Sequence, residues 1–378
     1  MKWMWTAVSF LLLATTACRR GPEGDPSGDA QKPVRIGSIL SLSGTLANYG
    51  ELEKRGFELA QRHINEEGGI DGRPLEILFE DSELDPKKAI SAYNKLTAVD
   101  KVPMIAGAVG SSVCLALAPL ATRDRVVVMS AGASSPKLTG ASPYFFRVAP
   151  SDTLGAARLV DWVLAEGHQR IALLAIENDY GVGQRDVALR RLEEKGRKSV
   201  LVESVLPEAS DLRPQIERIR KAKPDAVLLL THAPEAGYFL KQAKEAGFAV
   251  RTYGGDALTD PAILEIAGAA AEGARYLLPA RGAGPLYEKY ATAYREAYKA
   301  EPEALGLKAY ALAQVAAAAL RNAEYKGQAL QTYLSAMPDL DTAMGQVRFD
   351  QGGDIMKIRF DRLEYRNGKA TVIGTDEL

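Results

Sequence analysis

The chain has 378 residues, 47% of them hydrophobic, and its 47 basic and 48 acidic side chains leave a formal net charge of −1. This length suggests two domains of ordinary size. Charges of both signs are interspersed, which excludes the basic face or tail typical of nucleic-acid binding, so we expect no nucleic-acid partner.

The first 18 residues have the composition of an export signal. Lys2 is the only early charge, an apolar run follows it to residue 13, and small residues then lead to Cys18. The apolar run is shorter than the ~20 residues that cross a bilayer, so a cleaved signal peptide is predicted for residues 1–18. Small residues before a cysteine predict lipidation of Cys18. Plain secretion is the alternative, because Thr15 stands where a lipoprotein signal usually has an aliphatic residue.

Residues 19–32 contain mainly glycine, proline and charged residues. Such a segment cannot form a core, so we expect a flexible tether. Behind a lipid anchor, a tether would let a folded domain turn freely at a membrane surface. The protein is therefore expected in the periplasm or at the cell surface.

The segment after the tether predicts one βαβ unit. Pro33–Leu40 is an apolar, β-branched strand candidate, and a turn of small residues over 41–50 follows it. A helix is predicted from Glu51 to the glycine pair Gly68-Gly69, and a second strand at Leu75–Phe79. Ligands of open α/β sheets bind at the carboxyl ends of strands, which is where the turn lies.

Strands and helices continue to alternate along the rest of the chain. The rhythm of residues 33–148 is repeated over residues 170–278, which predicts an α/β protein with two doubly wound parallel-sheet lobes. Of the two cysteines, Cys114 is expected to be unpaired and packed in the interior, as a small hydrophobic residue.

Three fragments carry a family resemblance: LSLSGTLANYG at 40–50, INEEGGIDGRPLEILFEDSELDPKKA at 64–89 and MSAGASSPKLT at 129–139. Together they resemble the leucine/isoleucine/valine-binding protein family, the type I periplasmic solute-binding proteins of branched-chain amino-acid ABC transporters. The resemblance implies a three-segment hinge, crossed near Ala149, Pro279 and Gly345. It gives an N-terminal lobe of residues 33–149 plus 280–345 and a C-terminal lobe of residues 150–279 plus 346–378.

Two serine-rich turns in the first lobe are candidates for binding an anion. Ser111 and Ser112 lie between a strand and a helix, where hydroxyls and free N–H groups suit a carboxylate, although an ordinary helix cap would also select serine. Gly132 and Ser134 follow the next strand. The resemblance implies that Ser111 and Ser134 bind an α-carboxylate and that the main chain near Gly132 receives the α-ammonium.

Asp256 is the candidate acceptor in the second lobe. It follows a predicted strand, and it matches the acidic residue with which the family binds an α-ammonium. A charge-assisted hydrogen bond of this kind contributes ~1.5–3 kcal/mol. The alternative role is an N-cap for the helix near Pro261.

Aromatic residues complete the predicted site. Tyr49 and Tyr180 match family positions that lie against the ligand, and His232 stands where the family often has another tyrosine. An imidazole can hydrogen-bond a polar side chain, which leaves the branched-chain specificity open; His232 could also be a helix-entry residue without ligand contact.

The predicted function is an extracytoplasmic binding protein that closes on a small amino acid, branched-chain or related, and delivers it to the permease of an ABC transporter. A sensor of the same fold for an amide, urea or aromatic acid is the alternative. No nucleophile–base pair, metal spacing or dinucleotide fingerprint is present in the sequence, so we expect no enzyme and no cofactor. A monomer is expected.

Overall fold

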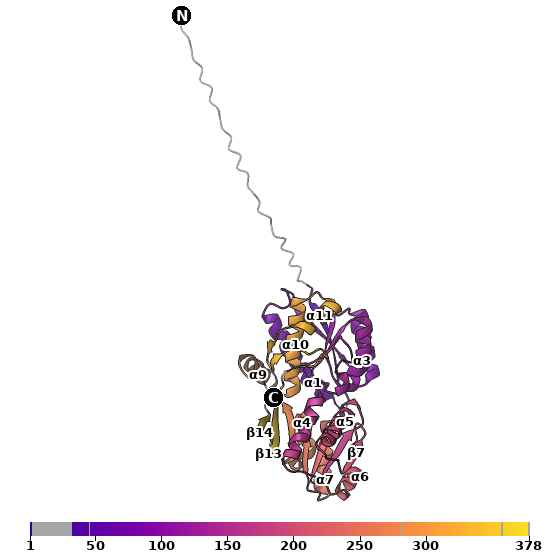
Figure 1. The fold of residues 1–378 in the computed structure, drawn as a ribbon. Coiled ribbons are helices and arrows are strands. Elements are labelled where there is room, and N and C mark those ends of the chain that lie inside the picture. Colours follow the sequence, from indigo (N-terminus) through magenta and orange to yellow (C-terminus); the bar gives the residue numbers. More distant parts are fainter. Residues whose placement is uncertain (2–31, 45, 281, 357, 377–378) are drawn as a thin grey trace.

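A computed structural model describes residues 1, 32–44, 46–280, 282–356 and 358–376, and it contains two α/β lobes stacked end to end (Figure 1). The predicted fold class is confirmed. The predicted signal peptide, most of the tether and the lipidation residue Cys18 lie outside the described residues.

The N-terminal lobe is built on a five-stranded sheet with the order β2-β1-β3-β4-β5, in which every pair is parallel. Its central strands are buried on both faces, as apolar runs in parallel sheets are. The strands are β1 (Val34–Leu40), β2 (Leu75–Asp81), β3 (Met104–Ala108), β4 (Val127–Ser130) and β5 (Phe145–Arg147).

Six helices pack in this lobe, three from the start of the chain and three that return from its C-terminal third. They are α1 (Ala47–Glu66), α2 (Pro86–Asn94), α3 (Ser111–Asp124), α9 (Pro285–Tyr298), α10 (Ala304–Asn322) and α11 (Gly327–Ala336). A π-helical turn, Lys95–Val99, continues α2, and a small hairpin of β11 (Leu340–Thr342) and β12 (Gly345–Val347) follows α11.

The C-terminal lobe contains a seven-stranded sheet with the order β14-β13-β10-β9-β8-β6-β7. Strands β6 to β10 are parallel, whereas β13 and β14 form an antiparallel edge. The strands are β6 (Ile171–Ile176), β7 (Leu201–Val205), β8 (Ala226–Leu230), β9 (Arg251–Gly254), β10 (Arg275–Pro279), β13 (Phe360–Arg366) and β14 (Lys369–Asp376). The helices are α4 (Asp152–Ala165), α5 (Asp179–Glu194), α6 (Arg213–Lys221), α7 (Ala233–Glu245) and α8 (Ala262–Ala267).

The segment after β12 differs from the expected division into lobes. Residues 346–355 were assigned to the C-terminal lobe, but Asp354 forms a β-bridge and an ion pair with Arg147 at the end of β5. The ring of Phe349 packs on Phe146 of the same strand, with centroids 5.2 Å apart. This segment therefore packs against the N-terminal lobe, and strand pairing in the other lobe resumes at Phe360.

Helix α1 begins earlier than the sequence indicated. We predicted a turn to residue 50, but the helix starts at Ala47, so Tyr49 and Gly50 lie in its first turn. A Cβ atom on Gly50 would stand 1.9 Å from the carbonyl oxygen of Ser41. The glycine that suggested a turn is required by close packing of the helix on the β1 loop.

Two glycines set the distance between α1 and α10. A Cβ atom on Gly56 would lie 2.1 Å from the carbonyl oxygen of Gly306, and one on Gly306 would lie 3.0 Å from the carbonyl oxygen of Leu52. The two backbones approach at this point because neither residue has a side chain. Glu53 of α1 and Lys308 of α10, which are close in sequence to these glycines, are both buried.

We expect Gly56→Ala to destabilise the protein by about 1–3 kcal/mol, because the added methyl group must push two backbones apart. Urea unfolding monitored by circular dichroism measures the change. Gly155→Ala in α4 is the matched control, since its Cβ would find only contacts of 3.7 Å and longer. Replacing Gly155 with alanine in the interior of α4 should stabilise the protein by about 0.5–1 kcal/mol, because glycine is the less favourable residue inside a helix. Equal effects of the two substitutions would contradict the close crossing.

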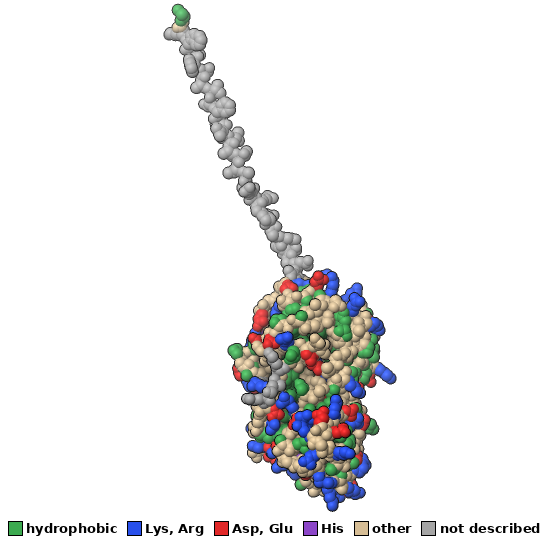
Figure 2. Space-filling model, in the orientation of Figure 1, with side chains coloured by type: hydrophobic (Ala, Val, Ile, Leu, Met, Phe, Trp, Pro, Cys, Tyr) green, Lys and Arg blue, Asp and Glu red, His purple; other side chains and the backbone are tan. Residues whose placement is uncertain are grey.

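Cys114 is unpaired and buried in α3, as predicted. On the face shown in Figure 2, blue and red side chains alternate over both lobes without a large patch of either sign. Among the described residues, no helix combines the length and the hydropathy needed to cross a membrane.

Candidate ligand-binding site

A pocket lies between the two lobes, at the carboxyl ends of their strands. The N-terminal lobe lines it with Tyr49, Leu52, Ser111, Gly132, Leu305 and Lys308, and the C-terminal lobe with Tyr180, His232, Asp256, Thr259 and Asp260. Its volume is about 60 Å³. A cavity of about 150 Å³ accommodates benzene, so the lobes as they stand leave too little space for a solute of that size.

Hydrogen bonds near the pocket join the two lobes. The amide nitrogen of Asn48 lies 3.0 Å from both carboxylate oxygens of Asp260. The backbone N–H of Ala233 donates to the hydroxyl of Tyr49 over 3.2 Å. Because each pair joins one lobe to the other, the lobes are closed on the pocket.

Ser111 lines the pocket at the start of α3. It is the first residue of α3, and Gly110 before it has φ +89°, a conformation that L side chains rarely adopt. The sharp turn points the free N–H groups of α3 toward the carboxyl edge of the sheet. Ser111 Oγ accepts from the backbone N–H of Ser135 at 3.1 Å, which leaves the hydroxyl hydrogen to donate.

Two of the predicted serines have other partners. The hydroxyl of Ser112 donates to Asp179 Oδ2 over 2.9 Å, outside the main pocket, and links α3 to the start of α5. Ser134 Oγ donates to Asp152 Oδ2 over 2.7 Å. Ser134 lines a smaller adjoining pocket with Asp152 and Asp256. The structure therefore brings Ser111 and Gly132 to the main pocket and places Ser112 and Ser134 beside it.

Asp256 lies in the pocket, but it already has a cationic partner. Its Oδ2 is 3.0 Å from Nζ of Lys308, which reaches across from α10 of the opposite lobe. The Lys308 side chain is 5% exposed and the Asp256 side chain 28%. Lys308 is not among the residues predicted from the sequence, and its ammonium changes the charge of the site.

A second carboxyl, that of Glu53 on α1, lies behind the pocket wall. Glu53 is fully buried, and neither of its carboxyl oxygens has a hydrogen-bond partner. A Cβ atom on Gly132 would lie 2.8 Å from Glu53 Oε1, so the glycine leaves room for the carboxyl. Burial raises the pKa of Glu53 to about 8, although the charge of Lys308 acts in the opposite direction.

Aromatic side chains form the wall of the pocket on the C-terminal lobe. The rings of Tyr180 and His232 stack with centroids 5.3 Å apart, and Tyr49 meets the His232 ring edge-on at 6.1 Å. Burial lowers the pKa of His232 to about 4, so the imidazole is neutral near pH 7. The wall is therefore aromatic and uncharged, and it suits an apolar group.

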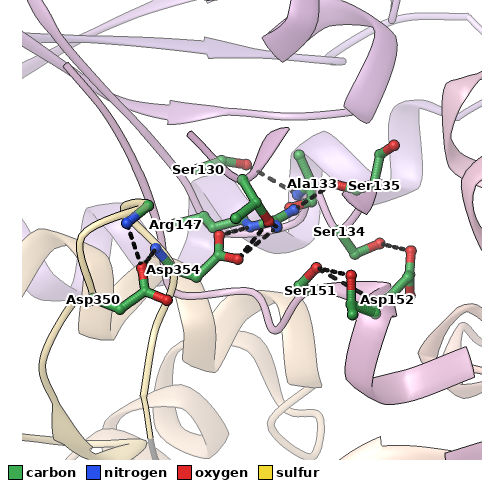
Figure 3. A network of polar contacts seen from close by, with 12 residues as sticks. Ser130, Ala133, Ser134, Ser135, Arg147, Ser151, Asp152, Asp350 and Asp354 are labelled. Atoms are coloured by element: carbon green, nitrogen blue, oxygen red, sulfur yellow. Dashed lines mark hydrogen bonds and ion pairs between the residues drawn. The ribbon is translucent and has the colours of Figure 1, made fainter. Parts of the chain in front are cut away.

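Arg147 holds the loop that carries Gly132 and Ser134 (Figure 3). Its guanidinium forms two bonds to Asp354, at 2.6 and 3.1 Å, and donates to the carbonyl oxygens of Ala133 and Ser135. Arg147 is fully buried. The positions of the loop carbonyls thus depend on an ion pair with the C-terminal segment.

Of the eight predicted site residues, six line the main pocket: Tyr49, Ser111, Gly132, Tyr180, His232 and Asp256. Three further residues at or behind the pocket were not predicted from the sequence: Lys308, Glu53 and Asp260. Lys308 could have been found, because it is the only charged residue between positions 304 and 320. Within the described part of the chain, no group of three or more His, Cys, Asp or Glu residues could hold a metal ion.

Two lobes closed over a pocket that contains a helix start, a carboxylate and an aromatic wall are typical of a two-lobe solute-binding protein. The model of the periplasmic binding protein family matches residues 33–357. The chain belongs to this family.

Several known proteins are similar to this chain in sequence or structure over about 90% of its length. The Leu/Ile/Val-binding protein homolog 3 of Brucella melitensis biotype 1 is 26% identical over 344 residues, covering 90% of this chain and 93% of its own. The leucine-binding protein LivK of Thermotoga maritima has a TM-score of 0.85 at 24% identity, covering 91% of this chain and 99% of its own. An ABC-transporter solute-binding protein of R. palustris, in complex with benzoate, has a TM-score of 0.83 at 20% identity, covering 91% and 96%.

Proposed function

We propose that this chain captures a small amino acid with an apolar side chain, branched-chain or related, and delivers it to the permease of an ABC transporter. The observation that carries the proposal is the pocket itself, in which Ser111 at the start of α3 faces an aromatic wall and the carboxylate of Asp256. The names of the similar proteins, Leu/Ile/Val-binding and leucine-binding, support the ligand class.

The proposed binding mode uses both lobes. The carboxylate of the ligand accepts from Ser111 and the free N–H groups of α3, while its ammonium donates to Asp256. The apolar side chain packs on Tyr180 and His232. A ligand that bridges the lobes in this way favours the closed form over the open one, which is the form a permease would bind.

The remaining parts of the proposal concern location and partners. They are export to the periplasm or cell surface, lipidation of Cys18, a permease partner and a monomeric state; the sequence signals support the first two, and the family supports export and the permease. The chain would act by binding alone and would catalyse no reaction. ATP hydrolysis would belong to another subunit of the transporter.

A second candidate is a carboxylic acid without an amino group, such as an aromatic acid, which the protein would transport or sense. The ion pair of Asp256 with Lys308 favours it, because the acceptor for an α-ammonium is already occupied. The benzoate complex of the R. palustris protein gives an example of such a ligand on this fold.

Calorimetric titration with modified ligands tests the proposal without altering the protein. Leucine, isoleucine or valine should bind. Leucine methyl ester should bind at least about tenfold more weakly, because it lacks the anion for Ser111 and α3. Isocaproate, which is leucine without its amino group, separates the two candidates. Failure of every amino acid to bind would overturn the amino-acid proposal, and binding of isocaproate or benzoate alone would establish the second.

A further inference from the structure

Lys308 makes an ion pair of a different kind from the others that join the lobes. Its ammonium lies inside the pocket, 3.0 Å from Asp256, and its side chain is 5% exposed. Lys137 and Asp179 also pair across the lobes at 3.0 Å, but their side chains are 55% and 32% exposed. Water screens the outer pair, whereas Lys308 would be left as a buried charge without Asp256.

The ammonium of Lys308 and the α-ammonium of an amino acid are the same chemical group. Both need a carboxylate acceptor, and in the pocket of the proposed function that acceptor is Asp256. Lys308 is anchored in α10 of one lobe and Asp256 follows β9 in the other, so their bond spans the lobes as a ligand would. The small volume of the closed pocket agrees with this, because the lysine chain fills space at the acceptor.

We propose that Lys308 is an internal substitute for the ammonium of a ligand: it pairs with Asp256 to favour closure without ligand, and it competes with an amino acid for that carboxylate. The competition rests on the proposed function. The effect on closure does not depend on the identity of the ligand.

Glu53 is a second buried carboxyl in the lobe that carries Lys308. Both of its carboxyl oxygens are without a hydrogen-bond partner, and the charge of Lys308 acts against the effect of burial on the pKa of Glu53.

The test compares the full-length wild type with Lys308→Met in two measurements. Small-angle scattering of the ligand-free proteins should give a more compact wild type and a more open variant. Calorimetry should show leucine binding about tenfold or more tightly to the variant, the range of one charge-assisted hydrogen bond. The affinity for isocaproate should not rise, since isocaproate has no ammonium to compete. Lys137→Met, which removes the exposed pair, should change neither measurement.

Three outcomes would overturn the proposal: a ligand-free wild type as open as the variant, leucine binding that is unchanged in the variant, or an equal gain for isocaproate. If neither compound binds to either protein, the proposed ligand class fails, and the scattering alone decides the role of Lys308. Lys308→Gln, which keeps a polar group but removes the charge, serves as the second variant should the methionine variant not fold. It is expected to change both measurements in the same direction.

Discussion

Replacing Arg147 with methionine is expected to lower the free energy of unfolding by about 3–5 kcal/mol, because it leaves Asp354 as a buried carboxylate without its partner. The guanidinium also anchors the carbonyl oxygens of Ala133 and Ser135. Loss of these bonds frees the loop that carries Gly132, so ligand affinity should fall together with stability. Urea unfolding and calorimetric titration measure the two effects.

Arg295→Met is the matched control for this experiment. Arg295 also forms several bonds to one carboxylate, that of Glu301, at 3.0–3.1 Å, but the two side chains are 45% and 71% exposed. Water replaces such a partner readily, so the loss should be about 1 kcal/mol or less. Similar losses in the two variants would show that burial of Arg147 does not set the strength of its ion pair.

The difference between these two arginines also shows what sequence could and could not predict. Apolar runs predicted the strands, because a parallel strand covered on both faces needs apolar side chains throughout. The α/β class and the order of elements followed from them. The partner of Arg147, in contrast, is Asp354, 207 positions away, and only the folded chain brings the two together. The same holds for Ser112 and Asp179, 67 positions apart.

The predicted residues that line the pocket mostly follow a strand, whereas Glu53 and Lys308, which the sequence did not indicate, lie within helices. Ser111, Gly132 and Asp256 were found because parallel strands bring their carboxyl ends to one edge. Glu53 and Lys308 were missed because a charged residue in a helix usually faces water. Both are instead buried, at positions close to the glycines where α1 and α10 approach each other.

The buried carboxyl of Glu53 should make stability fall as the pH rises. The pKa of Glu53 is raised from 4.5 to about 8 in the folded protein, so between these values the folded state holds a proton that the unfolded state has released. Stability is therefore fully present below pH 4.5 and is lost as the pH rises toward about 8. At about 1.36 kcal/mol per pH unit, the loss amounts to about 5 kcal/mol.

Glu53→Gln removes the ionisation while keeping the shape of the side chain. The variant should match the wild type within about 1 kcal/mol at pH 5 and exceed it by about 4–5 kcal/mol at pH 8.5. Urea unfolding across this range measures the difference between the two proteins, which cancels the titration of all other groups. Glu58→Gln, at an exposed position of the same helix, is the matched control. A Glu53→Gln difference as flat as that of the control would mean that the buried carboxyl does not exchange its proton in this range.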